Sequence, residues 1–123
     1  MIDRVFAGCG VLVHIPEGQQ AAATALSGSG PAYVALFTQA LIDAGVANGL
    51  PRDTATVLAS HTVWGTGTLM VEASLHPTLL KEQVTSPGGT TAQALRALHD
   101  GGLNSAVYAA VDAVIARTKE LGA

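Results

Sequence analysis

The chain has 123 residues, of which 49% are hydrophobic and only 12% are charged, and its formal net charge is −3. This length is typical of one domain, and a slightly acidic chain without a cluster of Lys or Arg argues against nucleic acid or an anionic membrane surface as a partner. The charged share is about half of the roughly 25% found in average proteins. We therefore expect a second copy of the chain to bury part of the surface.

We expect a cytoplasmic protein, because its cysteine usage suits a reducing compartment and its apolar segments fit neither a membrane span nor a signal peptide. Cys9 is the one cysteine of the chain, so an internal disulfide is excluded and a reducing compartment is expected. Residues 54–71 carry no charge but contain five Thr, one Ser, one His and two Gly, which favours a buried helix over a membrane span. The apolar residues 5–13 are interrupted by glycines and followed by His14, which argues against a signal peptide.

The first sixteen residues have a different pattern from the rest of the chain. Apolar residues at helical spacing, followed by two glycines, predict the end of a helix: Ile2, Val5 and Phe6. The β-branched run 11–15, which precedes a Pro-Glu-Gly turn, predicts one short strand. A lone strand has no sheet to join, so we predict that residues 1–16 are the remnant of another domain and that 17–123 form a helical domain.

From Pro31 onward the spacing of apolar residues predicts helices only. Pro31 suits the first helical position after a Ser29 or Gly30 cap, and Asn48-Gly49 ends this helix. The further predicted helices run from 51–53 to about 73, from 76–77 to about 84, from 90–91 to 101–102, and from 103 to about 121. The expected fold class is all-α, a helical bundle.

Common cofactor and metal motifs do not occur. The G-x-G triplets at 8–10, 28–30 and 65–67 lack the third small residue of a dinucleotide-binding turn, so no cofactor-binding residue is predicted in this chain alone. No two of the four histidines are four residues apart and there is no cysteine pair, which argues against a metal site.

The segment Thr85–Thr91 is the best candidate for ligand binding. Two consecutive glycines allow close approach of the backbone, and the next helix presents free N–H groups with the positive end of its dipole. Hydroxyls from Ser86, Thr90 and Thr91 would suit a small carboxylate. From the residues alone, a simple capped turn between helices is the favoured interpretation, with an anion site as the alternative.

Two longer motifs carry a resemblance to a known family. The segments Ala25–Tyr33 (ALSGSGPAY) and Thr85–Thr91 (TSPGGTT) are similar to the two signatures of the pyrroline-5-carboxylate reductases. Shorter matches fall in the same order: Asp43–Val46, Gly49–Arg52, His76-Pro77, Gly101-Gly102 and Arg117–Leu121. The resemblance runs from about residue 2 to 122. Leu75 departs from it, because Glu or Gln is usual before His-Pro in that family.

The resemblance implies a function and a set of site residues. The family reduces 1-pyrroline-5-carboxylate to L-proline, the last step of proline biosynthesis, with NADPH or NADH held by an N-terminal Rossmann domain that this chain lacks. In that family the helical domain forms a homodimer, which can assemble into a higher oligomer, and it holds the substrate's carboxylate. The implied substrate-binding residues are Ser86, Gly88, Gly89, Thr90 and Thr91. The implied catalytic residues are Thr91, at the ring nitrogen, and Thr24, near the nicotinamide.

Two hypotheses follow for the chain itself. The first is that it is the dimerisation and substrate-carboxylate-binding part of a reductase and is inactive without a cofactor domain. The second is that it is a stand-alone, non-catalytic module for dimerisation or ligand binding that has lost reductase activity.

Overall fold

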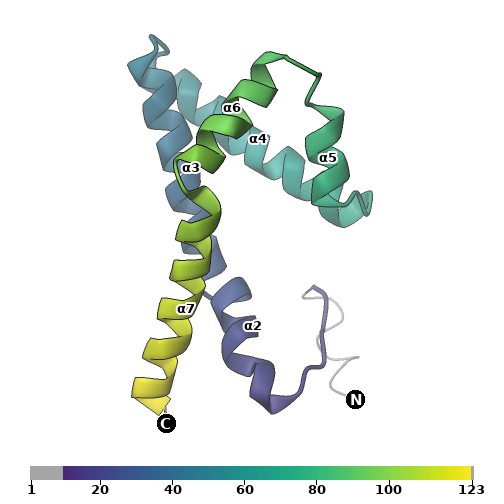
Figure 1. Cartoon of the computed structure of the whole chain (residues 1–123), viewed down its shortest axis with the longest axis vertical. Helices are drawn as coiled ribbons and strands as arrows, with labels where there is room; N and C mark the ends of the chain where they lie inside the picture. The colour runs from purple at the N-terminus through teal and green to yellow at the C-terminus, as the bar shows by residue number, and fades with distance from the viewer. Residues whose placement is uncertain (1–9, 123) are drawn as a thin grey trace.

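A computed structural model describes residues 10–122, and all regular structure in that range is helical (Figure 1). The elements in chain order are η2 (Glu17–Gln19), α2 (Gln20–Ser27), α3 (Gly30–Ala47), α4 (Arg52–Glu72), α5 (Pro77–Gln83), α6 (Thr90–Asp100) and α7 (Leu103–Gly122). The prediction of an all-α fold is confirmed, and the helices expected from Pro31 onward form close to the expected bounds.

The N-terminal part differs from the prediction. Residues 11–15, predicted as a strand, have no regular secondary structure, because no second strand is present in the described range to pair with them. Helix α2 was not predicted at all. The helix end expected at Ile2–Phe6 lies outside the described residues.

Helices α3 and α4 form an antiparallel hairpin closed by a Schellman motif. The N–H of Leu50 donates to the carbonyl of Gly45 (3.0 Å) and the N–H of Gly49 to that of Val46 (3.0 Å). Gly49 has a φ of +103°, which favours glycine at this position. A Cβ on Gly45 would lie 3.4 Å from the Cβ of Ala55, so small residues let the two helices approach closely.

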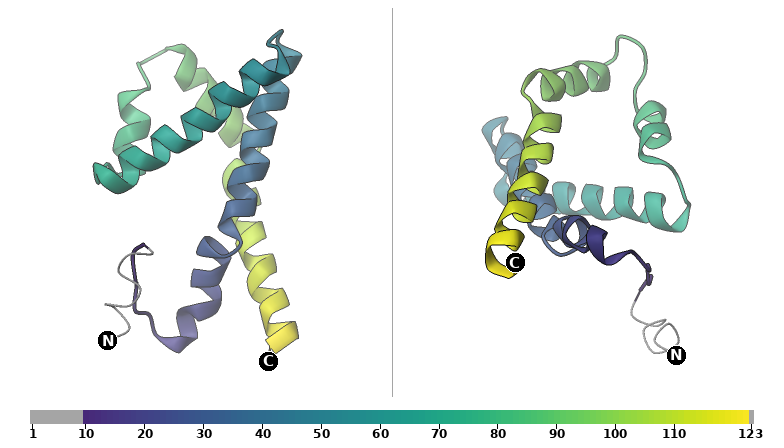
Figure 2. Two further views of the ribbon diagram at one scale, coloured as in Figure 1. Left: turned by 180° about the vertical axis from the view of Figure 1, so that it is seen from behind. Right: turned by 60° about the horizontal axis from the view of Figure 1, so that its bottom comes forward.

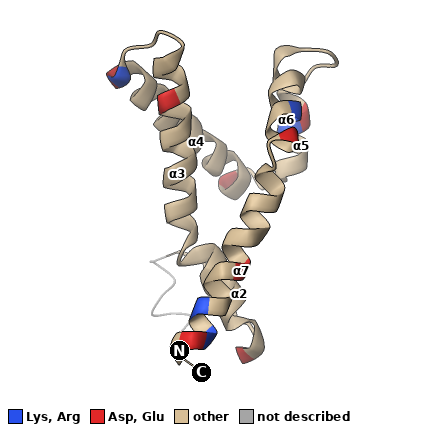
Figure 3. Ribbon diagram, turned by 60° about the vertical axis from the view of Figure 1, so that its left-hand side comes forward, with Lys and Arg blue, Asp and Glu red and all other residues tan. Residues whose placement is uncertain are grey.

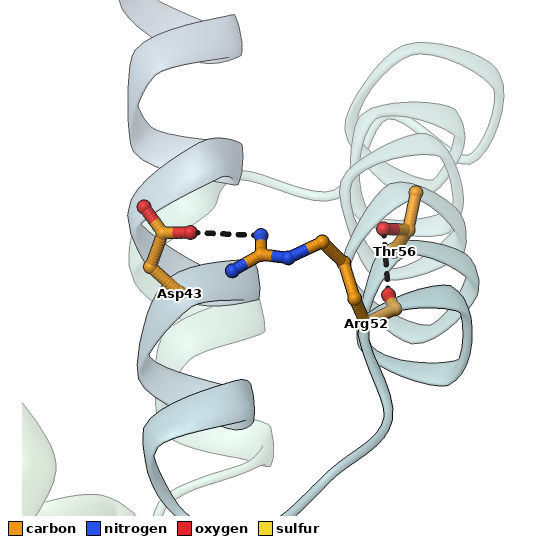
Figure 4. Close-up of polar contacts among 3 residues, drawn as sticks. All are labelled: Asp43, Arg52 and Thr56. Atoms are coloured by element: carbon orange, nitrogen blue, oxygen red, sulfur yellow. Dashed lines mark hydrogen bonds and ion pairs between the residues drawn. The ribbon is translucent and has the colours of Figure 1, made fainter.

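An ion pair joins the same two helices near their turn. The guanidinium of Arg52 donates to the carboxylate of Asp43 at 3.0 Å, and the hydroxyl of Thr56 donates to the carbonyl of Arg52 at 2.8 Å (Figure 4). Both charged side chains are more than half exposed, so the pair contributes at most about 1 kcal/mol to stability. The hairpin therefore depends mainly on its turn and on small-residue packing.

The other helices make few contacts with one another. Besides the hairpin, α2 packs along α7 and against α3, and α6 meets α7; α5 takes part in none of these contacts. The two views of Figure 2 show α4, α5, α6 and α7 following one another around an open frame. The chain is an extended set of helices rather than a closed bundle.

The single chain has almost no core. Only Ala25, Ala55 and Ala59 are buried hydrophobic residues in the described range, and no large side chain there is fully buried. The accessible surface is 9498 Å², whereas a compact protein of 12.4 kDa exposes about 6,100 Å². The excess is on the order of 3,000 Å². Charged residues lie chiefly near the helix ends, which leaves long uncharged stretches of helix between them (Figure 3). Among the described residues, no helix combines the length and apolarity needed to cross a membrane.

Candidate functional site

Helix α5, which precedes the candidate segment, is capped by hydrogen bonds at both ends. The Nδ1 atom of His76 accepts a hydrogen bond from the N–H of Thr78 (3.1 Å) and so caps α5. At the other end of α5, Thr85 donates its hydroxyl to the carbonyl of Lys81 (2.5 Å) and its N–H to that of Glu82 (3.1 Å). These bonds fix the point at which the chain leaves α5, so the following residues start from a defined position.

Ser86 and the two glycines then form a tight turn into α6. The N–H of Gly89 donates to the carbonyl of Ser86 at 3.0 Å. Gly88 has a φ of +69°, a conformation that side chains disfavour. Gly89 is the N-cap of α6, with a φ of −80° and a ψ of 179°. The turn therefore places Ser86 directly beside the first residues of α6.

The first turn of α6 has free hydrogen-bond donors. The carbonyl of Gly89 accepts from Gln93 (3.3 Å), but the N–H groups of Thr90, Thr91 and Ala92 have no acceptor in the part of the chain described. An N-cap side chain such as Ser or Asp would normally satisfy one of them, and Gly89 has none. These N–H groups and the positive end of the helix dipole together favour an anion.

Three hydroxyls surround these donors. Those of Ser86, Thr90 and Thr91 make no hydrogen bond within the described residues, in contrast to that of Thr85. Ser86 and Thr90 are exposed and Thr91 is half-buried, so the site is open to solvent in the single chain. The arrangement can accept a small carboxylate through several hydrogen bonds at once.

The structure brings Ser86, Gly88, Gly89, Thr90 and Thr91 together, but it does not bring Thr24 to them. Thr24 lies on α2, and its carbonyl accepts hydrogen bonds from Gly28 (2.8 Å) and Ser29 (3.1 Å). Helix α2 contacts α3 and α7, and it lies away from the turn between α5 and α6 in Figures 1 and 2. Within one chain, Thr24 cannot take part in the same site.

A second feature was not predicted from the sequence. An open apolar groove lies between α2, α3 and α7 and is lined by Leu26, Gly30, Pro31, Tyr33, Val34, Ala35, Val107 and Val111. Tyr33 lines this groove, and its hydroxyl is buried without a hydrogen-bond partner among the described residues. The signal for this feature was the tyrosine within the otherwise apolar stripe of α3, because a buried phenol needs an acceptor. Among the described residues, no group of His, Cys, Asp and Glu is arranged to hold a metal ion.

Comparisons with known proteins agree on one family. Residues 17–121 match the family described as pyrroline-5-carboxylate reductase dimerisation. A pyrroline-5-carboxylate reductase of Synechocystis is 48% identical over 118 residues, which cover 96% of this chain and 44% of that protein.

Solved structures give the same result. A pyrroline-5-carboxylate reductase from Coxiella burnetii superposes with a TM-score of 0.93 at 36% identity, over 99% of this chain and 46% of that one. The Plasmodium falciparum pyrroline carboxylate reductase with NADP bound gives a TM-score of 0.88 at 38% identity, over 99% of this chain and 48% of that one. The chain thus spans somewhat less than half the length of these relatives.

Proposed function

Because the chain belongs to the pyrroline-5-carboxylate reductase dimerisation family, we propose that it is the dimerisation and substrate-carboxylate-binding part of such a reductase. The complete enzyme would reduce 1-pyrroline-5-carboxylate to L-proline. The observation that carries this proposal is the start of α6, where three N–H groups without acceptors lie beside three hydroxyls without partners.

The proposed role of these residues is to bind and orient the substrate. The carboxylate would accept hydrogen bonds from N–H groups at the start of α6 and from the hydroxyl of Ser86. The hydroxyl of Thr91, on the same turn of the helix, would meet the ring nitrogen. Because hydrogen bonds to a charged group are worth about 1.5–3 kcal/mol each, a few of them are enough to fix the orientation of a small ring.

The chemistry itself would need little from side chains. A bound NADPH or NADH would supply hydride-transfer chemistry to the carbon of the C=N bond, and the hydroxyl of Thr91 or a water molecule would deliver the proton to the nitrogen. The chain's contribution is to hold the substrate in reach of the cofactor, and such positioning can lower a two-substrate barrier by roughly 7–11 kcal/mol. The described residues contain no strand followed by a glycine-rich turn, so the cofactor would be held by a Rossmann domain outside this chain.

Homodimerisation is the second part of the proposal. The excess accessible surface is on the order of 3,000 Å² for one chain and about 6,000 Å² for two, which is enough for the large interfaces of obligate dimers, about 2,000–5,000 Å² or more in total. A single chain with three buried alanines also has too little core to be stable alone. Since α2 and α6 do not meet within one chain, Thr24 would approach the carboxylate site only from the second copy.

Substitutions in a reconstituted enzyme test the site. In the chain joined to a cofactor domain of a related reductase, Ser86→Ala and Thr91→Ala should each raise the KM for pyrroline-5-carboxylate roughly ten- to a hundredfold. Thr85→Ala is the matched control, because its hydroxyl donates to the carbonyl of Lys81, and its KM should stay within about twofold of wild type. Unchanged KM values in both site variants would place the carboxylate elsewhere.

A further inference from the structure

We propose that Gly89 is a positioning residue for Ser86: its lack of a side chain lets the Ser86 hydroxyl lie over the free N–H groups of α6. This inference rests on the proposed function, in which Ser86 binds the substrate's carboxylate. It explains the absence of a side chain by backbone conformation at Gly88 and by the space that Ser86 occupies at Gly89.

Gly88 is required by backbone conformation, whereas Gly89 is not. At Gly88 the φ of +69° disfavours any side chain, although a Cβ there would meet no atom within 4 Å. At Gly89 the φ of −80° and ψ of 179° are ordinary extended values that any residue adopts, and they are usual for an N-cap. Within the chain, any constraint on a side chain at position 89 therefore comes from its neighbours in space and not from its backbone conformation.

Those neighbours all belong to one residue. A Cβ on Gly89 would overlap the Ser86 Oγ, well inside van der Waals contact, and would lie 3.2 Å from the Ser86 carbonyl oxygen and 3.6 Å from its Cβ. The two latter distances require shifts of a few tenths of an ångström at most. The hydroxyl, in contrast, must rotate to a different position.

This rotation should affect substrate binding but not the fold. Rotation of an exposed serine hydroxyl changes the fold very little, because the Ser86 Oγ has no hydrogen bond to lose within the described residues. It does remove the hydroxyl from the place it occupies beside the start of α6. A methyl group at position 89 would thus impair substrate binding through Ser86 while leaving the helices intact.

A double-mutant cycle in the reconstituted reductase tests this coupling. Ser86→Ala and Gly89→Ala should each raise the KM roughly ten- to a hundredfold. The KM of the double variant should not exceed the higher of the two single-variant KM values. The reason is that once the hydroxyl is absent, the added methyl has nothing to displace. KM effects that multiply in the double variant would overturn the inference, because Gly89 would then act independently of Ser86.

Two further measurements separate the possible failures. In a crystal structure of Gly89→Ala, the Ser86 χ1 angle should change by about one rotamer step, roughly 120°; an unchanged rotamer overturns the inference whatever the kinetics show. The thermal midpoint should fall less for Gly89→Ala than for Gly88→Ala, and the reverse order would also overturn it. If Ser86→Ala leaves the KM unchanged, Ser86 does not bind the carboxylate, and the crystal structure then decides the positioning role; the proposed function fails only if Thr91→Ala also leaves the KM unchanged.

Discussion

One face of α4 should be the main contact between two copies of the chain. Val57, Trp64 and Val71 recur every seven residues and are 57%, 70% and 74% exposed, which defines the α4 stripe. Ala55 and Ala59, on the opposite face, are buried. The Trp64 ring makes an edge contact with the His61 ring, at 6.0 Å between ring centroids, and is otherwise largely exposed. We predict that Trp64→Ala strongly weakens the homodimer.

The size of the effect follows from the exposed area. A tryptophan can bury up to about 250 Å², so a 70% exposed one has about 175 Å² left to bury. At about 25 cal/mol per Å², this corresponds to roughly 4 kcal/mol for complete coverage. Because every 1.4 kcal/mol is about tenfold in Kd, the loss should exceed a hundredfold even if the partner covers the ring incompletely.

Sedimentation equilibrium over a dilution series measures the dissociation constant. Trp64→Phe, which keeps an aromatic ring, should lose much less than Trp64→Ala. Val11→Ala is a second control, because Val11 is 88% exposed but lies outside the helices. An unchanged dissociation constant in Trp64→Ala would show that the α4 stripe faces solvent in the assembly and that the reasoning from exposed area is wrong.

Two smaller predictions concern polar groups. Tyr33→Phe should leave the free energy of unfolding in urea unchanged or raise it slightly, because the buried hydroxyl has no hydrogen-bond partner among the described residues and its removal relieves a desolvation cost; a loss of about 1 kcal/mol or more would contradict this. His76→Ala should lower the free energy of unfolding by about 0.5–2 kcal/mol, because the cap of α5 is lost, whereas His76→Asn should retain most of it; equal losses in both variants would exclude the cap as the cause.

The sequence predicted those helices that have clear boundaries. Pro31 and the Asn48-Gly49 pair mark the ends of α3, and Gly101-Gly102 separates α6 from α7, so those bounds followed from local chemistry. Helix α2 was missed because Gln20–Ser27 is short and alanine-rich, with Leu26 as its one large apolar residue. The strand at 11–15 was wrong because β-branched residues favour a strand only where another strand is available to pair.

The candidate site was predictable in composition but not in geometry. The Ser-Pro-Gly-Gly-Thr-Thr segment indicated an anion site, and the structure shows why its donors are free. The steric relation between Gly89 and Ser86 depends on distances that no pattern encodes. The separation of Thr24 from this turn was not predictable either, because it depends on how α2 packs along α7.

The 123-residue chain by itself should neither bind NADPH tightly nor reduce pyrroline-5-carboxylate. A dinucleotide needs a strand-to-helix turn whose N–H groups hold the pyrophosphate. Of the glycine triplets, Gly28–Gly30 lies between two helices and Gly65–Gly67 lies inside α4, so neither follows a strand. The triplet at 8–10 falls almost entirely outside the described residues. Without a pyrophosphate site, the nicotinamide is not oriented toward the bound substrate.

Loss of that orientation removes most of the rate enhancement over the uncatalysed reaction. Roughly 7–11 kcal/mol of barrier lowering comes from holding two reactants together, so collisions between free NADPH and bound substrate should proceed near the uncatalysed rate. The assay follows the absorbance of NADPH with the purified chain and pyrroline-5-carboxylate, before and after joining the Rossmann domain of a related reductase. Turnover by the chain alone would refute the prediction. Turnover only in the joined protein would support a role as part of a reductase, and none in either would favour a non-catalytic dimerisation module.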